Sequence, residues 1–138
     1  GALVVMDETT DAVRACLRVV RFFARESCGK CAPCREGTSW EEKVLQRILD
    51  GHGRPDDIEL LLEIGANISP GDYPVAAHLE AGLDPVPFPP KQTTICPLGP
   101  SSVAPITSAI RRFRHEFEAK MQAGAESEGE PVAAGSAQ

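Results

Sequence analysis

Aromatic residues and positive charge are both scarce in this sequence. Aromatic side chains account for 5% of the 138 residues, and the net charge is −6 at neutral pH. Nucleic-acid-binding domains generally present a basic face, and binders of single strands add aromatic side chains on which bases stack. The sequence therefore predicts no nucleic-acid partner.

Long hydrophobic runs are missing as well. No apolar stretch approaches the ~18 residues that a membrane-spanning helix requires, and no basic and then apolar secretory leader opens the sequence. We therefore expect no direct membrane insertion and a reducing compartment, where clustered cysteines bind metal or carry out redox chemistry more often than they form disulfides. The hydrophobic fraction of 42% and the charged fraction of 25% are ordinary for one modest globular domain.

Three of the five cysteines lie close together in the sequence. Cys28, Cys31 and Cys34 are separated by two residues each, and Cys96 follows in the stretch Thr-Ile-Cys-Pro-Leu-Gly at 94–99. A C-x2-C-x2-C run with a remote Cys-Pro is the way in which two-cluster bacterial ferredoxins hold one cubane cluster. The spacing therefore predicts a [4Fe-4S] centre with these four cysteines as metal ligands. The remaining cysteine, Cys16, is interpreted as a small buried hydrophobic residue.

Two other functions remain open for the same cysteines. Four thiolates also satisfy a structural zinc ion in an interaction domain, although zinc ligands commonly come as two pairs, whereas here three are adjacent and one is distant. A C-x-x-C pair is also typical of thiol redox catalysts, but no histidine lies near either cysteine motif in the sequence. We interpret His52 as a solvated residue at a helix end rather than as a metal ligand.

Hydrophobic periodicity predicts a mainly α fold, in which a four-helix bundle carries the cluster. Helices are expected over residues 11–25, from just after Cys34 to about 50, over 55–67, and over about 99–122, with Thr9 or Thr10 as the first N-cap and Pro105 in a first turn. The expected core stripes are Val13, Leu17, Val20 and Ala24, beside Ala12, Cys16, Val19 and Phe23; then Trp40, Val44, Leu45, Ile48 and Leu49; Ile58, Leu61, Leu62, Ile64 and Ile68; and Ile106, Ile110, Phe113 and Phe117.

The flanking segments have a different character. The apolar run at 2–6 predicts a terminal β-strand, so residues 1–8 are expected to end an upstream domain. The bundle is then assigned to residues 9–123, with a Pro-rich insertion at 70–92 in extended conformation, because its six prolines exclude a long helix. Residues 124–138 are small and acidic, and are expected to form a disordered tail.

Charged residues near the motifs suggest further roles. Both cysteine segments are expected at helix N-termini, whose partial positive charge offsets that of a thiolate-ligated cluster. Lys30 and Arg35 are expected to assist in this. Arg111, Arg112, Arg114 and His115 form a basic run, interpreted either as a solvated face or as a docking surface for an acidic partner.

The two cysteine motifs together are similar to those of a known family. Glu-Ser-Cys-Gly-Lys-Cys-x-Pro-Cys-Arg-Glu-Gly at 26–37 and Thr-Ile-Cys-x-Leu-Gly at 94–99 resemble the C-terminal iron–sulfur region of the NADH-binding flavoprotein subunit of respiratory complex I, the NADH-quinone oxidoreductase. The opening Val-Val-Met-Asp resembles the end of the ubiquitin-like (SLBB) domain that precedes the bundle there. Diaphorase subunits of NAD-reducing hydrogenases and NAD-dependent formate dehydrogenases are relatives, so the equivalent module of such a soluble enzyme is the alternative.

The resemblance implies an electron-transfer function within an oxidoreductase. In that family Cys28, Cys31, Cys34 and Cys96 correspond to the ligands of a [4Fe-4S] cluster, which receives electrons from reduced FMN and passes them on toward quinone. The family's FMN and NAD(H) sites lie in a region without a counterpart here, so this chain alone is expected not to oxidise NADH and no residue is predicted to be catalytic. The implied partners are subunits of the peripheral arm, especially a 2Fe-2S thioredoxin-like subunit and a multi-cluster subunit, at the cytoplasmic face of the inner membrane.

Overall fold

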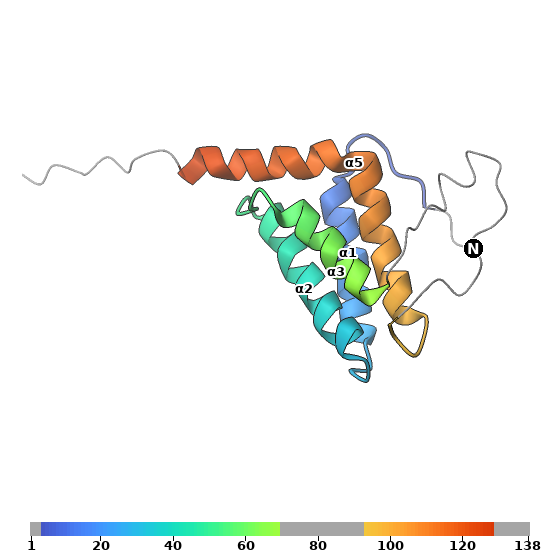
Figure 1. Cartoon of the computed structure of the whole chain (residues 1–138). Helices are drawn as coiled ribbons and strands as arrows, with labels where there is room; N and C mark the ends of the chain where they lie inside the picture. The colour runs from blue at the N-terminus through green and yellow to red at the C-terminus, as the bar shows by residue number, and fades with distance from the viewer. Residues whose placement is uncertain (1–3, 70–92, 129–138) are drawn as a thin grey trace, which may run out of the picture.

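Four helices make up the core of this computed structural model, which describes residues 4–69 and 93–128. They are α1 (Ala12–Glu26), α2 (Ala32–Leu49), α3 (Asp57–Ile68) and α5 (Leu98–Glu128). Each helix packs against the next, α5 closes the arrangement against both α1 and α2, and α1 and α3 lie diagonally opposite (Figure 1). The predicted mainly α fold with four helices is therefore confirmed. The predicted insertion at 70–92 lies outside the described residues.

The start of α1 differs from the expectation. Asp11 is the N-cap, because its carboxylate accepts a hydrogen bond from the backbone N–H of Arg14 at 2.9 Å. Thr9 and Thr10 are not available for this role, since both hydroxyls donate to the carboxylate of Asp7. A polar turn thus precedes the helix and sets its first residue.

No strand is present in the described part of the expected strand. Residues 4–6 are extended but unpaired, and Val4 and Val5 are exposed. A strand is stabilised by hydrogen bonds to a neighbouring strand, and the described residues contain no second strand with which it could pair. Residues 1–3 lie outside the described part of the chain.

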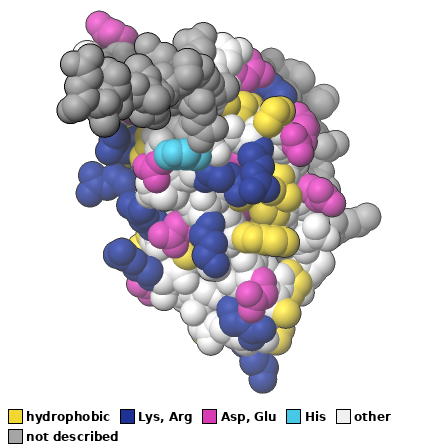
Figure 2. Space-filling view, turned by 90° about the vertical axis from the view of Figure 1, so that its left-hand side faces the viewer, with side chains coloured by type: hydrophobic (Ala, Val, Ile, Leu, Met, Phe, Trp, Pro, Cys, Tyr) yellow, Lys and Arg dark blue, Asp and Glu magenta, His cyan; other side chains and the backbone are white. Residues whose placement is uncertain are grey.

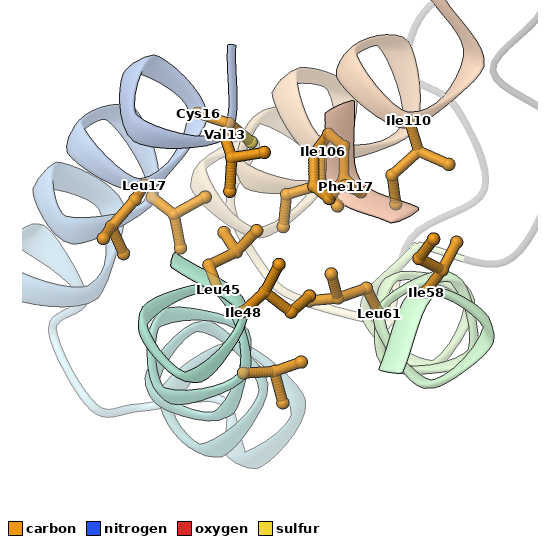
Figure 3. Packing of buried hydrophobic residues seen from close by; sticks show 12 residues of the cluster. Val13, Cys16, Leu17, Leu45, Ile48, Ile58, Leu61, Ile106, Ile110 and Phe117 are labelled. Atoms are coloured by element: carbon orange, nitrogen blue, oxygen red, sulfur yellow. The ribbon is translucent and has the colours of Figure 1, made fainter. Parts of the chain in front are cut away.

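One hydrophobic core joins all four helices. Their side chains point toward a shared centre (Figure 3), and each fully buried aliphatic residue contributes on the order of 1.5–3 kcal/mol. The core residues include Val13 and Leu17 from α1, Leu45 and Ile48 from α2, Ile58 and Leu61 from α3, and Ile106, Ile110 and Phe117 from α5.

Three residues expected in the core lie partly in solvent instead. Val19, Trp40 and Phe113 are 42%, 59% and 39% exposed. Trp40 precedes the buried position 41, and neighbouring residues on a helix point about 100° apart, so it lies beside the core-facing stripe of α2. Phe113 has a non-helical backbone conformation (φ −127°, ψ 26°) that breaks the long helix in two.

The break at Phe113 redirects α5. Its second part runs across the ends of the other helices (Figure 1). There Lys120 pairs with Asp11 at 2.7 Å, and Glu116 accepts a hydrogen bond from the backbone N–H of Ala12 at 2.9 Å. The helix continues to Glu128, so the expectation of disorder from Gly124 is wrong for residues 124–128, and residues 129–138 lie outside the described part. Because α5 begins at Leu98, Pro105 lies inside the helix rather than in its first turn.

Charges of both signs are mixed on the surface. Figure 2 shows one face on which Lys and Arg side chains alternate with acidic ones, with hydrophobic side chains exposed between them. Within the predicted basic run, Arg114 already pairs with Glu59 and Glu118, each at 2.8 Å. Among the helices that the structure describes, none has the length and hydrophobicity needed to cross a bilayer.

One carboxylic acid lies inside the bundle. Glu41 of α2 is fully buried, and neither of its side-chain oxygens has a hydrogen-bond partner within the described residues. Burial raises the pKa of Glu41 to about 8, so the side chain is protonated at neutral pH. Its position follows from the helix register, since Cys34, Thr38, Leu45 and Ile48 on the same stripe are also buried.

We expect the Glu41→Gln substitution to change how stability depends on pH. Between the ordinary glutamate pKa of 4.5 and the folded value of about 8, the folded chain holds a proton that the unfolded chain releases. The free energy of unfolding of the wild-type chain therefore falls as pH rises through this window, by up to about 1.4 kcal/mol per pH unit. The variant lacks this slope, and urea unfolding at pH 5, 6.5 and 8 measures the difference.

The matched control is Glu63→Gln, because Glu63 is an exposed residue of α3. Its unfolding free energy should follow that of the wild-type chain at each pH. Parallel pH dependences for Glu41→Gln and wild type contradict the assignment of a buried, protonated Glu41.

Candidate metal centre

The loop between α1 and α2 carries the first cysteines. Ser27 is the C-cap of α1, and its backbone N–H donates to the carbonyl oxygen of Phe23 at 3.0 Å. Gly29 has a φ of +77°, in the left-handed region that side chains other than glycine disfavour. The Arg35 guanidinium donates to the carbonyl oxygen of Gly29 at 2.8 Å. These contacts fix a tight turn that leads the chain from one helix into the next.

Two of the cysteines lie at the start of α2. Cys31 is the N-cap residue, and Cys34 lies in the first turn behind Pro33. The expectation that this helix starts only after Cys34 is therefore wrong by about one turn. The consequence favours metal binding, because the N-terminal turn of a helix has free N–H groups and partial positive charge, which stabilise thiolates.

The fourth cysteine comes from a segment that packs onto the end of α3. The Thr93 hydroxyl donates to the carbonyl oxygen of Ile68 at 2.8 Å, and Thr94 is buried with its hydroxyl donating to the carbonyl oxygen of Cys96 at 3.0 Å. A Cβ added at Gly99 would lie 2.7 Å from the Thr94 side chain, so the first turn of α5 approaches this segment closely. The position of Cys96 is thus set by helix packing.

A direct contact joins the two cysteine segments. The backbone N–H of Ile95 donates to the Cys31 sulfur at 3.3 Å, across 64 positions of sequence. The residue next to Cys96 is therefore held beside the first motif, as the predicted cluster requires.

All four predicted ligands line one pocket. Cys28, Cys31, Cys34 and Cys96 surround it together with Ser27, Lys30 and Thr94, and it holds about 350 Å³ of empty space, part of it open to solvent. The cysteines are not in disulfides, and their exposure is graded: Cys34 is buried, Cys31 is intermediate, and Cys28 and Cys96 are exposed. The pocket therefore has a protein side and a solvent side.

The spacing of the thiols fits a multi-iron core. Within residues 4–69 and 93–128, no three His, Cys, Asp or Glu side chains converge closely enough to hold one metal ion. Zinc lies about 2.3 Å from each thiolate sulfur, which draws its ligands together. A cubane has its own iron and sulfide between the protein ligands, so they surround it at a greater separation. Four thiols around an open pocket are the donor set that such a cluster takes.

The electrostatics of the pocket favour a positively charged guest. Burial is the main cause that raises the pKa of the Cys34 thiol, and negative charge on the other three cysteines raises it further. The hydrogen bond with Ser27 acts in the opposite direction. Deprotonated thiols at this site therefore need compensation by metal, and metal binding releases their protons.

The two basic residues near the loop have different positions. Lys30 lines the pocket, as expected, so its charge lies beside the thiols. Arg35 is not among the lining residues, because its side chain bonds to Gly29 and pairs with Glu36 at 2.7 Å. Arg35 therefore orders the loop.

The other candidate ligands lie away from the pocket. Cys16 is 5% exposed and belongs to the hydrophobic core (Figure 3), and burial, with a smaller effect of Glu41, raises the pKa of Cys16 to about 12. Its interpretation as a buried core residue is confirmed. His52 is exposed in the turn between α2 and α3.

Sequence reasoning did not find the hydrogen-bond donors around the thiols. The Ser27 oxygen lies 3.5 Å from the Cys34 sulfur, and the Ile95 amide contacts Cys31. Ser27 is adjacent to Cys28 in the motif, but no spacing rule pairs it with a cysteine seven positions away. A backbone donor such as that of Ile95 leaves no signal in residue type.

Comparisons with known proteins agree with this geometry. Residues 14–73 match the family model of the NADH-ubiquinone oxidoreductase-F iron-sulfur binding region. The mitochondrial NADH-ubiquinone oxidoreductase 51 kDa subunit of Neurospora crassa is 37% identical over 135 residues, 98% of this chain and 23% of that subunit. The NADH-quinone oxidoreductase-F protein of Rickettsia bellii is 35% identical over 122 residues (88% and 24%), and that of Rhodobacter capsulatus 35% over 123 residues (89% and 23%).

The helical bundle and its matched segment define an iron–sulfur binding domain. The chain belongs to the NADH-ubiquinone oxidoreductase-F iron-sulfur binding region family, and it spans about a quarter of the length of these relatives. The matched segment contains Cys28, Cys31 and Cys34, whereas Cys96 lies beyond it. The case for Cys96 as a ligand therefore rests on its place in the pocket.

Cysteine substitutions test the ligand set. We expect Cys96→Ser to lower the iron bound by the anaerobically reconstituted chain, because it removes one of four thiolates. Cys16→Ala is the matched control, and it should retain the full iron content while lowering the free energy of unfolding by about 1 kcal/mol through lost packing. Iron analysis and urea unfolding measure the two effects. Full iron retention by Cys96→Ser, or iron loss from Cys16→Ala, contradicts the assignment.

Proposed function

We propose that this chain is the electron-transfer module of the flavoprotein subunit of an NADH:quinone oxidoreductase, and that Cys28, Cys31, Cys34 and Cys96 hold its [4Fe-4S] cluster. The observation that carries the proposal is that thiols from two distant segments line one pocket. The family match and the similarity to NADH-quinone oxidoreductase subunits support the same function.

A bound [4Fe-4S] cluster would supply one-electron transfer between reduced FMN and the next iron–sulfur cluster. The chain's own residues contribute ligation, partial burial and hydrogen bonds to sulfur. Electron transfer needs no side chain to act as an acid, base or nucleophile, so we assign no catalytic residue. Cys28 and Cys96 are exposed, which makes their side of the pocket the approach for a redox partner.

The proposed setting follows from the relatives. Because these are named as subunits of NADH-ubiquinone and NADH-quinone oxidoreductases, we infer that this chain works inside such a complex. The proposed neighbours are a 2Fe-2S thioredoxin-like subunit and a multi-cluster subunit, with the complex at the cytoplasmic face of the inner membrane. FMN and NAD(H) would bind outside this chain.

Metal analysis tests the proposal directly. After anaerobic reconstitution with iron and sulfide, the chain should hold about four irons and four sulfides, and dithionite reduction should produce the EPR signal of a reduced cubane. One zinc per chain without acid-labile sulfide overturns the proposal in favour of a structural zinc domain.

The same sample tests where NADH reacts. Dithionite should bleach the visible absorption of the reconstituted chain, whereas NADH alone should leave it unchanged, because the flavin that accepts hydride lies outside this chain. Absorption spectra recorded anaerobically with each reductant measure the difference. Rapid bleaching by NADH without added flavoprotein contradicts this division of function.

A further inference from the structure

We propose that the Ser27 hydroxyl donates a hydrogen bond to the Cys34 thiolate and thereby raises the reduction potential of the cluster. This inference rests on the proposed function, since it requires Cys34 to be a ligand. It assigns Ser27 as a positioning and tuning residue that acts through Cys34.

The direction of the hydrogen bond follows from ligand chemistry. Ser27 Oγ and Cys34 Sγ are 3.5 Å apart, and in the metal-free chain either group has a hydrogen to donate. Once Cys34 binds metal it is a thiolate, which has no proton and accepts only. The hydroxyl of Ser27 is then the donor, and the sulfur gains a charge-assisted hydrogen bond.

The fold holds the donor in place. The backbone N–H of Ser27 donates to Phe23 at the end of α1, while Cys34 belongs to the first turn of α2. The two helices pack against each other, so the distance between hydroxyl and sulfur is set by helix packing as well as by the loop. Ser27 also lines the pocket. Cys34 is the buried member of the four cysteines, where a hydrogen bond is least weakened by water.

The effect on the potential has a definite sign. Reduction adds negative charge to the cluster and its sulfur ligands. A hydrogen bond stabilises the more negative state more strongly, so the donor favours reduction. Loss of the hydroxyl should therefore shift the reduction potential to a more negative value.

Four variants separate the hydroxyl from the shape of the side chain. Ser27→Thr keeps the hydroxyl, and Ser27→Val has nearly the shape of threonine without it. Both are β-branched and suit the extended backbone of Ser27 (φ −61°, ψ 120°). Ser27→Ala removes the hydroxyl with the smallest change in volume. Ser108→Ala removes an exposed hydroxyl from α5 that bonds the Pro105 carbonyl oxygen, outside the pocket.

The experiment is an EPR-monitored redox titration of each reconstituted chain, together with iron and sulfide analysis. We expect Ser27→Ala and Ser27→Val to change the equilibrium constant for reduction on the order of tenfold, a shift of about 59 mV to more negative potential for one electron. Ser27→Thr and Ser108→Ala should match wild type. Deuterium exchange followed by electron–nuclear double resonance should show one exchangeable coupling that Ser27→Thr keeps and Ser27→Ala loses.

Each outcome decides the proposal. Wild-type potentials in both Ser27→Ala and Ser27→Val, at full iron content, overturn it while leaving the proposed function intact. Loss of iron from Ser27→Val but not from Ser27→Thr supports the hydroxyl as the donor that holds Cys34 in its ligand state. Equal loss from both shows that packing matters instead of the hydrogen bond, and overturns it. A wild-type chain that never holds sulfide removes the proposed function itself.

Discussion

The packing of residues 93–97 against the start of α2 and the end of α3 is the constraint on which the metal centre depends. Three thiols come from one loop and meet without further help, but the fourth comes from a distant part of the chain. Thr93 binds the end of α3, and the Ile95 amide binds the Cys31 sulfur. Without these contacts Cys96 has no fixed place, because a long connection by itself positions nothing.

A second, smaller layer of packing supports this end of the bundle. Ile64 and Ile68 of α3 pack with Val103 of α5, apart from the main core. Ile68 also accepts the hydrogen bonds of Thr93, so a residue of this layer directly anchors the segment that carries Cys96. Ligand positions are therefore coupled to helix packing. Closing the long connection adds an entropy cost that grows only slowly with its length, and metal ligation offsets it.

Much of this arrangement is readable in the sequence, for physical reasons. The helices follow from apolar residues that recur every three or four positions, and the shared pocket follows from the cysteine spacing and the remote Cys-Pro. The errors have physical causes too. Trp40 and Phe113 are hydrophobic, but the register of α2 and the break in α5 decide whether they are buried, and both depend on packing between helices. Glu41 lies on the core stripe of α2, a signal that spacing alone would have given.

The break in α5 closes the bundle at the end away from the cysteines (Figure 1). Lys120 and Glu116 hold the second part of α5 to the start of α1, and Met121 packs on the core. The two ends are thus secured by different chemistry, ionic and apolar contacts at one and thiol ligation at the other. Removal of metal therefore loosens one end while the other stays latched, which gives the apoprotein a native-like scaffold onto which iron and sulfide are assembled.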